Sequence, residues 1–124
     1  MSDEGDIRSH RDLKVWRTAM SAAEAAYAFT MPFPPAEMYG LTSQIRRSAA
    51  SIAANIAEGY GRDSSGAYVN HLRIAQGSLK EFETFVELAC RVGLASVDAA
   101  QPLLDQCDEL GRMSRALNRA IERT

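Results

Sequence analysis

Arginine is the side chain in this sequence best suited to binding a ligand. The chain has twelve arginines and only two lysines. A guanidinium presents a planar fork of N–H donors that matches phosphate oxygens, and a group of arginines binds a nucleic-acid backbone without reading its sequence. One such group lies in the middle of the chain, at Arg46, Arg47, Arg62 and Arg73. We interpret it as a candidate nucleic-acid-binding surface, with ion pairs to neighbouring glutamates as the alternative.

A second basic group recurs every three or four residues near the end of the chain, at Arg112, Arg115, Arg119 and Arg123. This spacing places the four side chains on one face of a helix. Phosphate binding is one interpretation, but cations near a helix C-terminus also stabilise its dipole, and we favour that structural role. An acidic set precedes it, at Glu81, Glu83, Glu87, Asp98, Asp105, Asp108 and Glu109. It indicates a solvated face or a contact with the arginines of another copy.

The most unusual polar pair is Asn55 and Glu58, which are three residues apart and therefore on one helix face. Such a pair in an apolar helix is either a polar site or a hydrogen-bond network that joins neighbouring helices. We favour the structural network. Arg62 lies four residues beyond Glu58 and is a candidate partner for it.

No catalytic or cofactor pattern is present in the sequence. A di-iron site in a helical bundle needs Glu-x-x-His pairs, and neither His10 nor His71 has a glutamate three residues before it. Phosphate-binding glycine loops and the G-x-S-x-G motif are also missing. Cys90 and Cys107 form no CxxC pair and fall at apolar helical positions, which indicates buried thiols. We predict no enzyme, no metal and no cofactor.

The elements that position these side chains are all predicted to be helical. Alanine is abundant and no strand alternation occurs, so we expect an all-α fold, an antiparallel up-down-up-down four-helix bundle. Residues 1–9 are expected to be disordered or frayed, and residues 10–124 to form the bundle. The helices are predicted at about residues 12–30, 39–60, 64–92 and 97–123, with a stiff, proline-rich connector at residues 31–35.

Apolar spacing predicts the core-facing side of each helix. The first stripe is Leu13, Trp16, Met20, Ala23 and Tyr27. The second is Leu41, Ile45, Ser48 or Ala49, Ile52 and Ile56. The third is the most regular: Tyr68, Leu72, Ala75, Leu79, Phe82, Val86 and Ala89. The fourth is Leu103, Cys107, Leu110, Ser114, Leu117 and Ile121.

Several local features are predicted from residue type. Asp12 is expected to cap the first helix and Ser64 or Ser65 the third. Gly59-Tyr60-Gly61 is expected to end the second helix in the left-handed conformation, and Gly93 the third. A close helix crossing is expected at Gly77-Ser78, because glycine inside a helix costs about 1 kcal/mol relative to alanine. Pro102 is expected in the first turn of the fourth helix.

Charge is segregated along the chain although the net charge is only −2. Residues 39–80 and 110–124 each carry a net +3, whereas residues 81–109 carry −6. The chain is therefore not globally basic, but it contains basic segments large enough to bind phosphate. No apolar run approaches the roughly 20 residues that a membrane span needs, and no signal peptide is recognisable. We predict a cytoplasmic protein that does not contact membranes.

Four segments carry a resemblance to a known family: DLKVW at residues 12–16, YGLTSQIRRSA at 39–49, SIAANIAEGYGR at 51–62 and IAQGSLKE at 74–81. With them the chain resembles the 23S rRNA intervening-sequence protein family, also called the four-helix-bundle protein family. The resemblance extends over about residues 10–121, and its longest part is specific. Among the relatives is the accessory variability protein of diversity-generating retroelements.

The resemblance implies an antiparallel bundle that assembles as a ring, typically a homopentamer. Genes of the family often lie within intervening sequences of bacterial 23S rRNA genes, and the accessory variability protein is a basic pentamer that binds nucleic acid and a reverse transcriptase. By resemblance, Arg46, Arg47 and Arg62 match basic positions of the family motif. We therefore predict a non-enzymatic homo-oligomer that binds RNA or DNA through arginines. A protein-interaction scaffold without nucleic-acid binding is the alternative.

Overall fold

A computed structural model describes residues 6–123 and confirms the all-α prediction. Its long helices are α1 (Lys14–Thr30), α2 (Leu41–Tyr60), α3 (Ser65–Arg91) and α4 (Val97–Glu122). Two short 3-10 turns precede α1 and α2, η2 (His10–Asp12) and η3 (Pro35–Glu37). The helix boundaries lie within two residues of those predicted, which is the usual uncertainty of helix ends.

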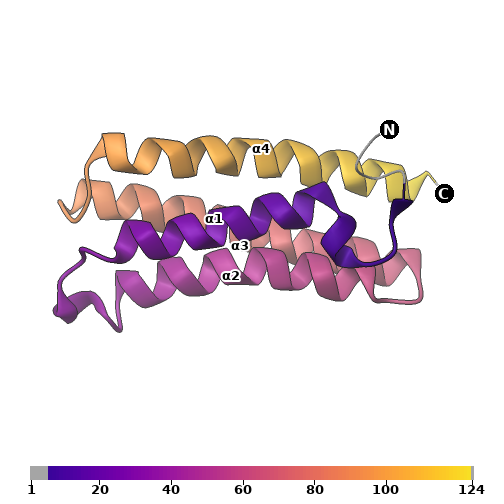
Figure 1. Ribbon diagram of the computed structural model, residues 1–124, viewed down its shortest axis with the longest axis horizontal. Coiled ribbons are helices and arrows are strands. Elements are labelled where there is room, and N and C mark those ends of the chain that lie inside the picture. Colours follow the sequence, from indigo (N-terminus) through magenta and orange to yellow (C-terminus); the bar gives the residue numbers. More distant parts are fainter. Residues whose placement is uncertain (1–5, 124) are drawn as a thin grey trace.

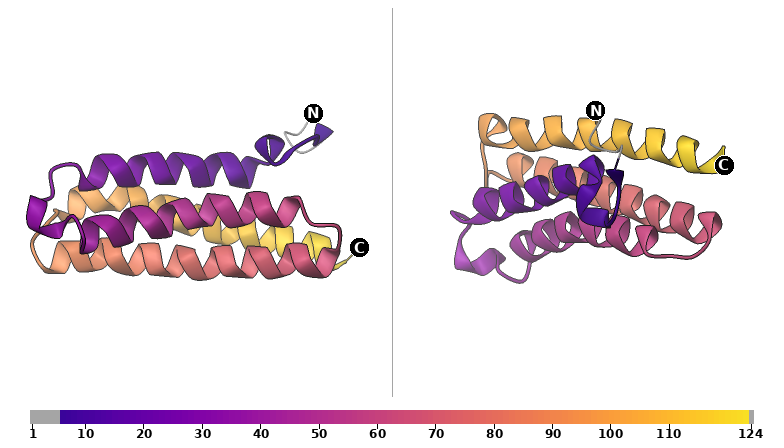
Figure 2. Two further views of the ribbon diagram at one scale, coloured as in Figure 1. Left: turned by 90° about the horizontal axis from the view of Figure 1, so that it is seen from below. Right: turned by 45° about the vertical axis from the view of Figure 1, so that its right-hand side comes forward.

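The four helices run side by side along the long axis and alternate in direction (Figure 1). Helix α1 begins and α4 ends at the same end of the bundle (Figure 2). Consecutive helices pack on one another, and α1 also packs on α4, which closes the bundle. Within residues 6–123, no helix is both long and apolar enough to cross a bilayer.

The core-facing sides of α2 and α3 are those that the apolar spacing predicts. Along α3, every predicted position from Leu72 to Ala89 is buried, and only Tyr68 is half-buried. Phe82 is the largest side chain that is completely buried. Along α2, the buried positions include Ile45, Ser48, Ala49, Ile52 and Ile56. The four-and-three spacing places these residues on one side of each helix, where they form a common core.

The predicted core stripe of the first helix is wrong at Met20 and Tyr27, whereas Leu13 is buried and Trp16 packs against the core. Met20 and Tyr27 are 40% and 49% exposed, and the buried face consists of Val15, Ala19, Ala22, Ala26, Phe29 and Thr30. Alanines occupy the line of closest contact because small side chains let helices approach. The larger Met20 and Tyr27 lie outside that line. Size was therefore a misleading guide to burial on this helix.

The caps of α3 and α4 follow from the serines that precede them. Ser64 Oγ accepts a hydrogen bond from the backbone N–H of Ala67, and Ser96 Oγ accepts one from Ala99. Gly93 ends α3 with φ of 83°, so the predicted glycine stop is confirmed. The Gly93 and Leu94 N–H groups reach back to carbonyl oxygens near the end of α3, as in a Schellman motif.

Asp12 was predicted to cap α1, but it instead closes a capping box around η2. Its carboxylate accepts the backbone N–H groups of Arg8 and Ser9, while Ser9 Oγ accepts the N–H of Arg11. These hydrogen bonds hold the pKa of Asp12 below its usual value. Of the segment predicted to be frayed, residues 1–5 lie outside the described residues. Within the rest, Ile7 packs against the core.

Two predictions about glycine are wrong. Gly61 follows α2 with φ of −79°, in the right-handed region, and Gly59 lies buried inside the helix. A Cβ added to Gly59 would lie 2.9 Å from the Cβ of His71, so the close approach of α2 to α3 occurs at Gly59. A close crossing was expected at Gly77-Ser78. Nothing lies within 4 Å of a Cβ added to Gly77, whereas Ser78 is buried and its Oγ lies 2.8 Å from Ser51 Oγ on α2.

Pro102 was predicted in the first turn of α4, but α4 begins at Val97, as predicted, and Pro102 is its sixth residue, in the second turn. Proline has no N–H, so the carbonyl of Asp98 has no partner one turn later. Further along α4, Asn118 is buried, which the apolar spacing does not predict. Its Oδ1 has no hydrogen-bond partner within residues 6–123.

Candidate nucleic-acid interface

Arg46 is held against the end of α1 by two contacts. Its Nε donates a 2.8 Å hydrogen bond to Thr30 Oγ1, and its guanidinium lies 4.5 Å from the centre of the Tyr27 ring. Thr30 is buried, and its hydroxyl donates in turn to the carbonyl of Ala26. The cation–π contact and the hydrogen bond fix the side chain and leave the terminal guanidinium nitrogens available to a ligand.

Arg47, the next residue, is held from the other side of α2. Its Nε and Nη2 donate to Gln44 Oε1, and Nη2 also lies 3.2 Å from Glu81 Oε2 on α3. The pair with Glu81 is about half exposed on both sides, so water screens it strongly. The remaining Nη1 group has no partner within residues 6–123.

Three segments meet around these arginines. Tyr27 comes from the last turns of α1, Tyr39 from the turn after η3, and the arginines from α2. They line a shallow pocket of about 370 Å³ together with Met38, Thr42, Ser43 and Ala50. We call Tyr27, Tyr39, Arg46 and Arg47 the tyrosine–arginine surface. The proline-rich connector reverses the chain between α1 and α2 and so brings the two tyrosines beside the arginines.

The four predicted binding arginines do not form one cluster. Arg62 lies past the end of α2, about 24 Å from Arg46 at 1.5 Å of rise per residue. Its Nε lies 3.2 Å from His71 Nε2. Arg73 lies on α3 and reaches Glu122 on α4 with Nη2 at 3.4 Å. Only Arg46 and Arg47 therefore share a surface.

Asn55 and Glu58 both reach His71, across the contact between α2 and α3. His71 Nδ1 lies 3.3 Å from Asn55 Oδ1 and 3.6 Å from Glu58 Oε2. Arg62 Nε–H donates to His71 Nε2, so Nε2 accepts, and the N–H of the imidazole ring lies on Nδ1. Glu58 pairs with His71 rather than with Arg62, which four-residue spacing had indicated as a partner.

The row of polar side chains between α2 and α3 continues from Asn55 through two serines that the sequence did not indicate. Asn55 Nδ2 donates to Ser51, and Ser51 Oγ lies 2.8 Å from Ser78 Oγ on α3. Their spacing could have indicated them, because Ser51 lies four residues before Asn55 and Ser78 lies seven after His71, so each serine shares a helix face with its neighbour in the row. The row satisfies polar side chains between two helices, as a structural network does.

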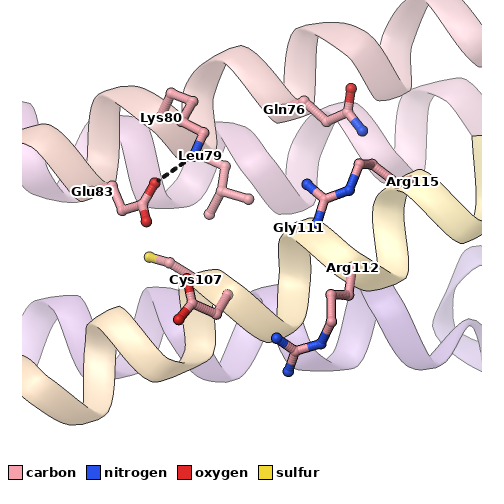
Figure 3. A pocket seen from close by; sticks show the side chains of 9 residues that line it. Gln76, Leu79, Lys80, Glu83, Cys107, Gly111, Arg112 and Arg115 are labelled. Atoms are coloured by element: carbon pink, nitrogen blue, oxygen red, sulfur yellow. Dashed lines mark hydrogen bonds and ion pairs between the residues drawn. The ribbon is translucent and has the colours of Figure 1, made fainter.

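Of the four arginines predicted on one face of α4, Arg112 and Arg115 line a different pocket, of about 310 Å³, between α3 and α4 (Figure 3). The Arg115 guanidinium lies over Gly111, with Nη1 3.2 Å from where a Cβ would be, and Arg112 points away from it. Neither arginine has an ion pair within residues 6–123. Glu83 and Asp108 line the same pocket, and Lys80 is bound to Glu83 at 3.0 Å. Mixed charge makes this pocket a poorer phosphate site than the tyrosine–arginine surface.

Cys107 lies at the same pocket and is buried. Burial raises the pKa of its thiol to about 12, so the thiol stays protonated at neutral pH and is a poor nucleophile. Cys90 is half-buried, and its thiol lies 3.6 Å from the Ser96 carbonyl oxygen. No group of three potential metal ligands occurs within residues 6–123.

Comparisons with known proteins agree with this architecture. A family model described as "23S rRNA-intervening sequence protein" matches residues 11–116. A crystal structure of a protein with unknown function from the S23 ribosomal protein family, from Bacteroides thetaiotaomicron, is similar with a TM-score of 0.75 and 23% identity. The match covers 84% of this chain and 97% of that one, and at this identity it shows the fold alone. No curated protein matches the chain.

Proposed function

Because the chain belongs to the 23S rRNA-intervening sequence protein family, we propose that it is a non-catalytic, homo-oligomeric helical bundle that binds RNA or DNA through the tyrosine–arginine surface. The observation that carries the proposal is the adjacent pair Arg46 and Arg47. Neighbouring side chains hold both guanidinium groups in place, and each keeps N–H donors available for a phosphate. A donor that is already fixed loses less conformational entropy when it binds.

The distribution of charge supports the same surface. Residues 39–80 carry a net +3, although the whole chain carries −2. Residues 81–109 carry a net −6 and include Glu81, which partly neutralises Arg47 at 3.2 Å, so Arg46 is the stronger phosphate donor of the pair. Arg62 and Arg73 lie elsewhere and engage His71 and Glu122, so we assign them no primary phosphate contact.

Removal of the arginine pair is expected to weaken binding and its salt dependence together. The measurement is fluorescence anisotropy of a labelled RNA hairpin with a single-stranded loop, titrated at several salt concentrations with wild-type protein and with Arg46→Gln/Arg47→Gln. Each lost phosphate contact should lower the slope of log K against log salt by about 0.7 to 0.9.

The matched control is Arg112→Gln/Arg115→Gln, which removes the same charge from α4. We expect this control to bind nearly as wild type. Equal losses in the two double variants would mean that net charge alone drives binding. No binding of the hairpin by wild-type protein at low salt would refute the function.

A second surface supports self-association. Ile74, Leu88 and Val92 are exposed large apolar side chains on one side of α3. They lie beside the buried stripe of α3, and no other helix within residues 6–123 covers them. A second copy of the chain would remove this apolar surface from water.

Light scattering is expected to give a mass five times the 13.6 kDa of one chain, the pentamer that the resemblance implies. Leu88→Glu should lower that mass, because it places a charge in the stripe. Val97→Glu, at an exposed valine on α4, is the control and should leave the mass unchanged. A monomeric wild-type protein would contradict self-association and would favour the alternative, a scaffold whose apolar stripe binds a different protein.

A further inference from the structure

We propose that the tyrosine–arginine surface selects single-stranded over double-stranded nucleic acid, with an unpaired base stacking on Tyr39 while Arg46 and Arg47 hold the neighbouring phosphates. This inference rests on the proposed function and names its ligand class. It goes beyond the arginines because phosphate contacts alone do not distinguish one strand from two. The distinction comes from the aromatic rings beside them.

Tyr39 presents almost its whole ring to water. It is 96% exposed, the most exposed of the large apolar side chains in the part of the chain that the structure describes. A ring in this position contributes nothing to the core, whereas its free face can take a base. Base–aromatic stacking is tolerant of sequence because every base has a π-face.

The backbone around Tyr39 is fixed, so the ring stands on a rigid turn. The N–H of Gly40 donates to the Glu37 carbonyl oxygen at 2.9 Å, and the N–H of Leu41 donates to Glu37 Oε1 at 3.1 Å. Glu37 therefore spans the turn from η3 to α2 with both its backbone and its side chain. Because the backbone that carries the ring is already ordered, less conformational entropy is lost when a base binds to it.

The second tyrosine contributes through the arginine that it holds. One face of Tyr27 is occupied by the Arg46 guanidinium, so Tyr27 orients a phosphate donor rather than stacking a base there. Arg47 lies on the other side of the same pocket with its Nη1 group available. The surface thus places cations beside a free aromatic ring, which is the combination that single-strand binding proteins use.

A duplex cannot use this combination fully. Its bases are stacked on one another and paired, so their faces are not available to a protein ring unless a base is extruded. A duplex would contact the two arginines and leave Tyr39 unused. Single strands should therefore bind more tightly by the worth of one stacked base, about 5- to 150-fold.

The test compares labelled oligouridine with an RNA duplex of the same length, measured by fluorescence anisotropy at one low salt concentration. Tyr39→Ala is expected to weaken binding of oligouridine about 5- to 150-fold and to leave duplex binding nearly unchanged. Tyr39→Phe keeps the ring and should restore binding of the single strand. Met31→Ala trims an exposed side chain that has no ring and does not line this pocket, so it serves as the control.

The outcomes separate this inference from the proposed function. If Tyr39→Ala leaves oligouridine binding unchanged while Arg46→Gln/Arg47→Gln weakens both probes, the single-strand inference fails and the function stands. If wild-type protein binds neither probe, both fail. If light scattering shows that Tyr39→Ala dissociates the oligomer, Tyr39 belongs to a protein contact and the inference is overturned.

Discussion

Gly59→Ala is expected to lower the free energy of unfolding by about 1–3 kcal/mol, the usual cost of overpacking a tight contact. The added Cβ would lie 2.9 Å from His71 Cβ, 3.0 Å from Tyr68 Cδ1 and 3.2 Å from the Tyr68 carbonyl oxygen. The last of these atoms is backbone, so α3 as a whole must move to relieve the contact. The same shift would disturb the hydrogen bond between His71 and Asn55.

The matched control is Gly77→Ala, which makes the same chemical change inside the neighbouring helix. Nothing lies within 4 Å of its added Cβ. The alanine there gains helix propensity of up to about 1 kcal/mol and should stabilise the protein. Urea denaturation of both variants gives the comparison. A Gly59→Ala variant as stable as Gly77→Ala would show that α2 and α3 do not approach closely at Gly59.

Phe82→Ala is expected to lower the free energy of unfolding by about 3–5 kcal/mol. Phe82 lies near the middle of α3 and is completely buried, so its truncation removes apolar contacts and leaves a cavity. Domains of this size are stable by only about 5–15 kcal/mol in total. The variant should therefore unfold at a much lower urea concentration, or be largely unfolded without urea, as far-UV circular dichroism would show.

Phe85→Ala is the control for Phe82→Ala, because it removes the same ring one turn away. Phe85 is only half-buried, so water can occupy part of the space that its ring leaves. We expect a clearly smaller loss than at Phe82. Equal losses in the two variants would mean that the two phenylalanines are equally buried in solution, as they would be if a second chain covered the outer side of α3.

Apolar spacing predicted the buried side of α3 correctly, but it did not predict that of α1. On α3, the four-and-three repeat from Leu72 to Ala89 predicted the buried positions correctly. On α1, the same reasoning chose the larger Met20 and Tyr27, while Ala19, Ala22 and Ala26 are the residues at the contact. Helix packing favours small residues at the line of closest approach, which a search for large apolar residues overlooks.

The candidate site was only partly predictable. The arginine pair is visible in the sequence, but Tyr27 is nineteen residues before Arg46, and only the reversal of the chain between α1 and α2 brings them together. Arg62 and Arg73 show the opposite error. They have the same side chain as the pair and lie in the same basic segment of the sequence. The antiparallel arrangement nevertheless places them away from the pair, with His71 and Glu122 as their partners.

The sequence by itself determined the helices, their ends to within two residues, and the buried sides of α2 and α3. These depend on the spacing of neighbours along one helix and, for α3, on Ser64 and Gly93 at its ends. The tertiary structure alone decided which helices approach at Gly59, which arginine meets Tyr27, and which polar residues join Asn55. Those contacts depend on the rotation and separation of whole helices. Packing sets both, through side chains that are far apart in the sequence.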